Sequence, residues 1–243
     1  MAFARPGSDT NAAYDRYVEL SEARRNHEAH PLDKPENRSR LRNGELLIEA
    51  GSTLDNGKEI KVPNGMIQDW RGMTFMPNAN IGQVKAILQD YDNYKNYYAP
   101  DVTDSKQLAH SGDDYDVFLR LYKQQILTVV LNSNYHVRYV TPDAHRMSVI
   151  SRSTRIAEVR NPKGPFTDEH PVANDTGFLW RLNSYWRFEE ADGGVYAECE
   201  AISLSRDVPM GLGFMLRGFL QKFPKESMIN TLKGTKAAVQ SKH

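Results

Sequence analysis

The chain has 243 residues, of which 31 are Lys or Arg and 31 are Asp or Glu, so its formal net charge is zero. This balance supplies no overall field that would attract polyanions, which argues against a protein that coats nucleic acid. The charged fraction of 26% and the hydrophobic fraction of 40% are typical of a globular protein with a sizeable core. The single cysteine, Cys199, excludes an internal disulfide and a cysteine-built zinc site.

No apolar run approaches the roughly 20 residues that a membrane-spanning helix needs. The opening residues, MAFARPGSDTNAAYD, lack the apolar centre of a secretory signal. We therefore expect a soluble, cytoplasmic protein. A periplasmic or exported protein is the alternative, if a signal peptide was removed from a longer chain.

The first helix is predicted near the amino terminus. Residues 11–29 carry a loose apolar stripe that includes Tyr14 and Tyr17. Pro31 and Pro35 are expected to end this helix, because proline lacks a backbone donor and disfavours helical geometry in the residue before it. The polar residues that follow Pro35 are interpreted as a polar connection.

Two strands and a helix are predicted next. The strands cover residues 46–48 and 66–76, and turn-forming residues separate them. Asn80 is expected to cap a helix whose apolar residues recur at helical spacing as far as Tyr91. The rest of the chain up to residue 206 is mostly β-branched and aromatic. Its clearest strands are predicted at 115–122, 125–140, 145–159, 178–190 and 195–206.

The last hairpin permits a prediction of its register. Asp192-Gly193-Gly194 is a strong turn signal, and closing the hairpin there pairs Arg187 with Glu198. The same register predicts four further pairs: Trp186 with Cys199, Tyr185 with Glu200, Ser184 with Ala201, and Leu182 with Ser203. One face of the hairpin then carries the charges, and the other sets large side chains opposite small ones. This second face has room for a helix or a ligand.

The predicted elements follow an α+β order: a strand, a helix, a long run of antiparallel strands and a closing helix. A curved antiparallel sheet wrapped around one long C-terminal helix is the helix-grip fold. Residues 66–240 resemble the START-like superfamily, also called SRPBCC, which includes polyketide cyclases/dehydrases and lipid-transport proteins. The resemblance is greatest with bacterial members. It rests on the order of elements and on three stretches: GMTFMPNANIGQVKAILQDYDNYKNYYAP, GFLWRLNSYWRFEEADGGVYAECEAISLSRDVP and FPKESMINTLKGTKAAV.

The resemblance implies two regions. Residues 61–243 would form the helix-grip ligand-binding domain, and residues 1–60 a polar N-terminal extension with one helix and one short strand. It also implies a cavity between the sheet and the last helix that holds a lipid, an isoprenoid or a polyketide-like ring system. Binding or transfer of such a ligand is the leading hypothesis. A cyclase/dehydratase or hydrolase is the alternative, and an interaction module that docks a partner through the N-terminal helix is a third, because fold does not settle function.

The candidate ligand-binding residues come from three places. Trp180, Leu182 and Trp186 share the less charged face of the last hairpin, where they line a pocket or contact the last helix. Arg120 and Arg155 are candidates for anchoring a ligand carboxylate or phosphate. The alternative for these arginines is a ladder of cross-strand ion pairs on the outer face of the sheet, because a buried guanidinium needs a partner.

The third place is the apolar, basic segment before the last helix. It contributes Met215 and Phe219, and it could contact a membrane transiently during ligand exchange. The alternative is a core-packing turn of helix with exposed lysines.

The sequence gives little support for a metal site, a catalytic nucleophile or a nucleotide-binding site. His27 and His30 stand three residues apart, but no third ligand is in sight, so we interpret them as exposed polar residues. Cys199 lies in mid-strand and is expected to remain protonated and unreactive. The Gly-x-Ser-x-Gly and dinucleotide-binding motifs are missing. We therefore predict no catalytic residue, no metal and no cofactor.

Overall fold

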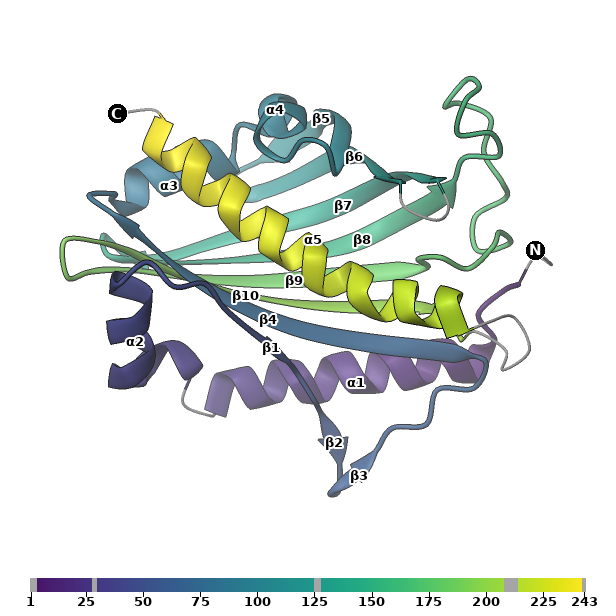
Figure 1. The fold of residues 1–243 in the computed structure, drawn as a ribbon, viewed down its shortest axis with the longest axis horizontal. Helices are drawn as coiled ribbons and strands as arrows, with labels where there is room; N and C mark the ends of the chain where they lie inside the picture. Colours follow the sequence, from purple (N-terminus) through teal and green to yellow (C-terminus); the bar gives the residue numbers. More distant parts are fainter. Residues whose placement is uncertain (1–3, 28–29, 125–127, 208–213, 242–243) are drawn as a thin grey trace.

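The computed structural model describes residues 4–27, 30–124, 128–207 and 214–241, without the side chains of 214–221. Within these residues, eight antiparallel strands form one sheet in the order β1-β4-β10-β9-β8-β7-β6-β5 (Figure 1). The strands are β1 (Leu47–Ala50), β4 (Gly65–Pro77), β5 (Val102–Ser111), β6 (Asp114–Gln124), β7 (Thr128–Asp143), β8 (Arg146–Glu158), β9 (Arg181–Ala191) and β10 (Gly194–Arg206). A separate two-stranded ribbon contains β2 (Leu54–Asp55) and β3 (Lys58–Glu59).

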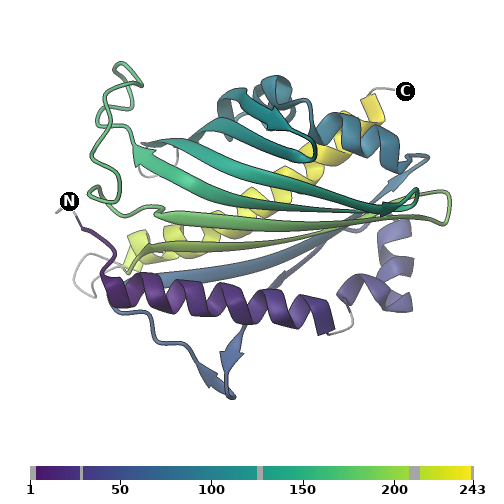
Figure 2. The same cartoon turned by 180° about the vertical axis from the view of Figure 1, so that it is seen from behind.

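Helices cover both faces of the curved sheet. They are α1 (Ser8–His27), α2 (Pro35–Arg42), α3 (Ile81–Leu88), α4 (Tyr94–Tyr97) and α5 (Phe214–Ser241), with 3₁₀ turns η1 (Pro31–Asp33) and η2 (Tyr91–Asn93). Figure 1 shows α5 crossing one face, which we call the inner face, and Figure 2 shows α1 on the opposite, outer face. A curved antiparallel sheet gripping one long C-terminal helix confirms the predicted α+β helix-grip fold.

The predicted register of the last hairpin is confirmed. β9 and β10 pair Arg187 with Glu198 and Trp186 with Cys199, and the three other predicted pairs follow. The N-cap is confirmed too: the Asn80 side chain accepts a hydrogen bond from the Gln83 amide at 2.9 Å. The helix that it caps ends at Leu88. The backbone of Asp90, with φ −86° and ψ 58°, is no longer helical, and the 3₁₀ turn η2 begins after it.

The interpretation of the residues after Pro35 as a polar connection was wrong, since they form α2. Pro35 occupies the first helical position, where its missing N–H is no loss. Leu41 is buried in a cluster with Leu32, Phe75 and Tyr196. This apolar anchor lies on another part of the chain, so the local pattern alone did not reveal the helix.

The N-terminal segment is an integral part of the molecule, because β1 pairs with β4 and α1 lies on the outer face. The Tyr14 hydroxyl donates to the Ile202 carbonyl at 2.9 Å, and Tyr17 donates to Asp69 Oδ2 at 2.9 Å. Glu200 accepts hydrogen bonds from Arg24 and Arg25 on the same helix. The division of the chain at residue 60 into extension and domain stays a prediction.

Two carboxylates beneath α1, Asp69 and Glu200, have pKa values shifted in opposite directions. Burial raises the pKa of Asp69 to about 7, and the neighbouring Glu200 carboxylate adds to the rise. Burial alone would raise the pKa of Glu200 as well, but the guanidinium groups of Arg25, Arg24 and Arg71 hold it below its ordinary value. Glu200 therefore carries the negative charge, and Asp69 takes up a proton near neutral pH.

Asp69→Asn is expected to flatten the dependence of stability on pH. The folded-state pKa, about 7, lies above the ordinary value of 3.8. Between these values the folded protein holds a proton that the unfolded chain has lost, so raising the pH lowers the free energy of unfolding. The amide removes this titration and still accepts the Tyr17 hydrogen bond. Urea unfolding between about pH 5 and 8 measures the slope. Glu36→Gln, at an exposed position of α2, is the control, and an unchanged slope in Asp69→Asn would contradict the assignment.

Candidate functional site

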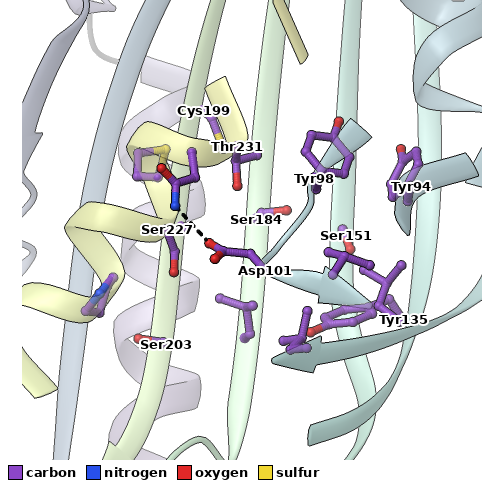
Figure 3. Close-up of a pocket in the computed structure, with 18 of the residues that line it drawn as sticks. Tyr94, Tyr98, Asp101, Tyr135, Ser151, Ser184, Cys199, Ser203, Ser227 and Thr231 are labelled. Atoms are coloured by element: carbon purple, nitrogen blue, oxygen red, sulfur yellow. Dashed lines mark hydrogen bonds between the residues drawn. The ribbon is translucent and has the colours of Figure 1, made fainter. Parts of the chain in front are cut away.

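A cavity of about 260 Å³ lies between the inner face of the sheet and α5 (Figure 3). β6 to β10 provide its floor, and the 3₁₀ turn η2 and α4 provide one wall. The first described turns of α5 cover it, through Phe223, Pro224, Ser227, Met228 and Thr231. The cavity predicted between sheet and last helix is therefore present.

The cavity exists because α5 approaches the sheet closely on one side only. α5 contacts β4 and β1 on one side and α3 and α4 near its C-terminal end. Gly72 on β4 permits the close approach, since a Cβ there would lie 2.5 Å from Leu232 Cδ1. Gly234 does the same beneath α4, where a Cβ would lie 2.6 Å from the Tyr97 carbonyl oxygen. Over the middle strands, from β6 to β9, the described side chains of α5 and the sheet enclose the cavity between them.

Small side chains form the centre of the floor. Ser151 on β8 pairs directly with Ser184 on β9, and Ser184 pairs with Ala201 on β10. Larger residues flank this row, among them Leu182 and Trp186. The prediction that this hairpin face sets large side chains opposite small ones, with room beside them, is confirmed.

A network of tyrosines closes one end of the cavity. The Tyr139 hydroxyl donates to the Leu88 carbonyl at 2.7 Å, and the Tyr94 hydroxyl donates to the same oxygen at 2.5 Å. Tyr91 contacts the Tyr139 hydroxyl at 2.7 Å, and Tyr98 contacts Thr235 of α5 at 3.0 Å. Burial raises the pKa of each of these tyrosines, so their hydroxyls stay neutral.

Charged side chains occur at one part of the wall. Lys123 on β6 forms an ion pair with Asp101. Asn230 on α5 donates to the same carboxylate at 3.2 Å, and the dashed line in Figure 3 ends on Asp101. Lys123 Nζ also lies 4.9 Å from the centre of the Phe223 ring. These contacts link α5 to the edge of the sheet and leave both charges paired.

Ionisable groups suited to acid–base chemistry are few in this cavity. Among the described residues that line it, Asp101 is the carboxylate and histidine does not occur. Cys199 also lines it, and burial raises the pKa of its thiol, in agreement with the predicted inert cysteine. Within the part of the chain that is described, no group of His, Cys, Asp and Glu could hold a metal ion.

Two of the predicted ligand-binding residues, Leu182 and Trp186, line the cavity. Trp180 does not: it lies on the outer face, in a cluster with Tyr14 and Ile202. The strict alternation that placed it with Trp186 fails just before β9. Arg181 pairs with Leu204, and the Trp180 N–H also donates to the Leu204 carbonyl at 2.8 Å. Trp180 and Arg181 therefore both lie opposite Leu204, as in a β-bulge. The extra residue reverses the alternation, so the Trp180 side chain lies on the outer face.

The predicted arginine anchor is also misplaced, because Arg120 and Arg155 lie on the outer face. Arg120 donates to Asn132 at 2.9 Å and to Asp104 at 3.0 Å, and Arg155 pairs with Glu169. The Arg120–Asp104 pair is a cross-strand ion pair of the alternative interpretation, whereas Glu169, the partner of Arg155, lies in the loop between β8 and β9. Leu119 and Leu121, the neighbours of Arg120 on β6, line the cavity, so Arg120 points away from it.

Met215 and Phe219 lie in α5, in the part of the helix for which only the backbone is described, so their side chains lie outside the described residues. Sequence reasoning placed Ser184 and Ser203 on the hairpin face that lines the cavity, but it missed the tyrosines and Ser151. Alternation along β7 was the available signal, since Tyr135, Val137 and Tyr139 share one face. The face itself could not be assigned without the position of α5.

A second hollow, of about 250 Å³, lies between α1 and the outer face. Several of the charged groups that line it already pair with other residues of the protein: Glu200 with Arg25, and Glu22 with Arg152. Val149 and Trp186 border both hollows, so the sheet separates them. We therefore place the candidate site on the inner face.

Tyr139→Phe is expected to lower the free energy of unfolding by about 1–3 kcal/mol, because it deprives the buried Tyr91 hydroxyl of its partner and removes a donor from the Leu88 carbonyl. Urea unfolding measures the loss. Tyr115→Phe is the matched control, since Tyr115 does not line the cavity and its hydroxyl makes no hydrogen bond within the described residues. Equal stabilities of the two variants would contradict a structural role for the network.

Comparisons with known proteins bear on this geometry. No family model matches the sequence, and no curated protein matches it. A fragment of a STAR-related lipid transfer protein from Xanthomonas axonopodis aligns with a TM-score of 0.51 and 14% identity, over 79% of this chain and 98% of that chain. The Zhui aromatase/cyclase from Streptomyces sp. R1128 aligns with a TM-score of 0.51 and 9% identity, over 72% and 94%. The chain therefore has the START-like helix-grip fold.

Proposed function

We propose that this protein binds a hydrophobic small molecule in the cavity between the sheet and α5, and holds or transfers it. The observation that carries the proposal is the cavity itself, which apolar side chains and neutral hydroxyls surround almost entirely. Burial of about 200 Å² of apolar ligand surface would contribute about 5 kcal/mol, before the cost of association. The similar solved structures described as a lipid transfer protein and an aromatase/cyclase support a ligand of this general kind.

Binding is favoured over catalysis by the chemistry of the described lining. General acid–base catalysis needs a positioned group with a suitable pKa. Asp101, the carboxylate among these residues, is engaged with Lys123 and Asn230. A cyclase/dehydratase or hydrolase would have to use this carboxylate or a tyrosine whose pKa burial raises.

Exchange of the ligand through transient membrane contact, by the segment that holds Met215 and Phe219, stays a prediction. The same is true of the cytoplasmic location. Along the described residues, none of the helices is both long and apolar enough to cross a membrane.

Ser184→Phe tests the proposal directly. Ser184 lies between Ser151 and Ala201 on the floor, so a phenyl ring there would occupy the space of a ligand. Naphthalene is expected to raise the melting temperature of the native protein, because a ligand that binds only the folded state stabilises it. Ser184→Phe should lose this response. Ser111→Phe, at an exposed position of β5, is the matched control and should keep it.

Native mass spectrometry after mild purification provides a second measurement, in which a retained hydrophobic molecule is expected. The proposal fails if the native protein responds to no hydrophobic probe and retains no ligand. It also fails if Ser184→Phe responds to naphthalene as the native protein does.

A further inference from the structure

Several hydroxyl groups on the floor of the cavity make no hydrogen bond of normal geometry with the described residues. Tyr135 on β7 is 4% exposed and lines the cavity. Its hydroxyl lies near Ser133 but makes no hydrogen bond of normal geometry with the described residues. A buried hydroxyl without a partner is destabilising, and such groups in native proteins usually have a functional or solvent partner.

Two serines continue this feature across the neighbouring strands. Tyr135 pairs with Ser153 and Val137 pairs with Ser151, so Ser151 lies diagonally beside Tyr135. Ser151 in turn pairs directly with Ser184. Within the described residues, neither of the hydroxyls of Ser151 and Ser184 makes a hydrogen bond. We call Tyr135, Ser151 and Ser184 the hydroxyl tract; Figure 3 shows all three among the residues that line the cavity.

Contrasting contacts show that the tract is not simply a polar patch of the fold. Ser153, the next residue on the same face of β8, accepts a hydrogen bond from the Leu182 N–H at 2.9 Å. Ser133, two residues before Tyr135, donates to the Leu119 carbonyl at 2.8 Å. The protein therefore satisfies these two neighbouring hydroxyls, whereas those of the tract make no hydrogen bond of normal geometry with the described residues.

The charged residues that line the cavity bear on the charge that its ligand can carry. The charged residues among the described lining are Asp101 and Lys123, which pair with each other. Arg120 and Arg155, the predicted partners of a ligand carboxylate or phosphate, lie on the outer face. Burial raises the pKa of Tyr135 to about 12, so its hydroxyl is a neutral donor at physiological pH. An ionised group on the ligand would lose its hydration without gaining a counter-ion.

The size of the ligand follows from the volume. A cavity of about 150 Å³ holds one benzene ring. By proportion, about 260 Å³ corresponds to roughly ten non-hydrogen atoms, the size of a fused two-ring molecule. A phospholipid with two acyl chains is several times larger.

We infer that the ligand is an uncharged, two-ring-sized hydrophobic molecule with a hydroxyl or keto oxygen that hydrogen-bonds the hydroxyl tract, foremost Tyr135. This inference rests on the proposed function and narrows it. Apolar burial provides the binding energy, and the tract orients the molecule by its oxygen.

Equilibrium dialysis of the full chain at neutral pH, with three probes, tests the inference. The probes are naphthalene, 2-naphthol and the 2-naphthoate anion. 2-Naphthol is expected to bind about 3- to 10-fold more tightly than naphthalene, the range of one neutral hydrogen bond. Naphthoate is expected to bind more weakly than both. Vesicles of phosphatidylcholine should lose no lipid to the protein.

Tyr135→Phe should bring 2-naphthol close to naphthalene in affinity, so that the ratio of the two affinities falls toward one. Tyr115→Phe, which removes a hydroxyl away from the cavity, should leave both affinities unchanged. The double variant Ser151→Ala with Ser184→Ala provides a second test if Tyr135→Phe is unstable, and it should also reduce the preference for 2-naphthol.

The outcomes separate this inference from the proposed function. Equal binding of naphthalene and 2-naphthol would overturn the role of the hydroxyl tract and leave hydrophobic binding intact. Tightest binding of naphthoate, or extraction of phosphatidylcholine, would overturn the uncharged or the two-ring class in the same way. Failure of every probe to bind would defeat both proposals.

Discussion

The hollow of this molecule depends on the position at which α5 is held above the sheet. Gly72 allows the helix to descend onto β4, and Gly234 allows it to lie against α4. Between these supports the helix spans the middle strands without filling the space over them. Close packing is the ordinary state of a protein interior, so an open volume lined by ordered side chains needs such a frame. Here the frame is one edge of the sheet together with the α3–α4 region.

The outer face contributes to the same frame from behind. Tyr14 and Tyr17 of α1 hydrogen-bond the strands, and Arg24 and Arg25 pair with Glu200. A buried cluster of charges is stable only when each charge has its partner, so this attachment specifies one position of α1. The strands beneath α1 include β9 and β10, which carry Trp186 and Ala201 on the cavity side. β9 and β10 thus contribute both to the polar outer cluster, through Glu200, and to the cavity floor, through Trp186 and Ala201.

The two faces of the sheet differ in the polar side chains that they carry. On the outer face, Arg120 and Arg155 meet carboxylates within the protein and need no ligand. On the inner face, tyrosines close one end of the cavity, and Tyr135 stands apart because its hydroxyl is left without a normal partner. Apart from the paired Asp101 and Lys123, the polar side chains in the described lining of the cavity are neutral. This separation distinguishes the candidate site from one built to hold an ionised head group.

Much of the fold followed from the sequence because its signals are local. The turn at Asp192-Gly193-Gly194 determined the hairpin register from Arg187–Glu198 to Leu182–Ser203, and Asn80 marked the start of α3. The cavity lining did not follow in the same way. Trp180 changed faces at a bulge that only the pairing with Leu204 reveals, and α2 depends on burial of Leu41 against distant strands. Alternation places residues on one face or the other, but the position of α5 decides which face is hollow, and that position depends on contacts between segments far apart in the chain.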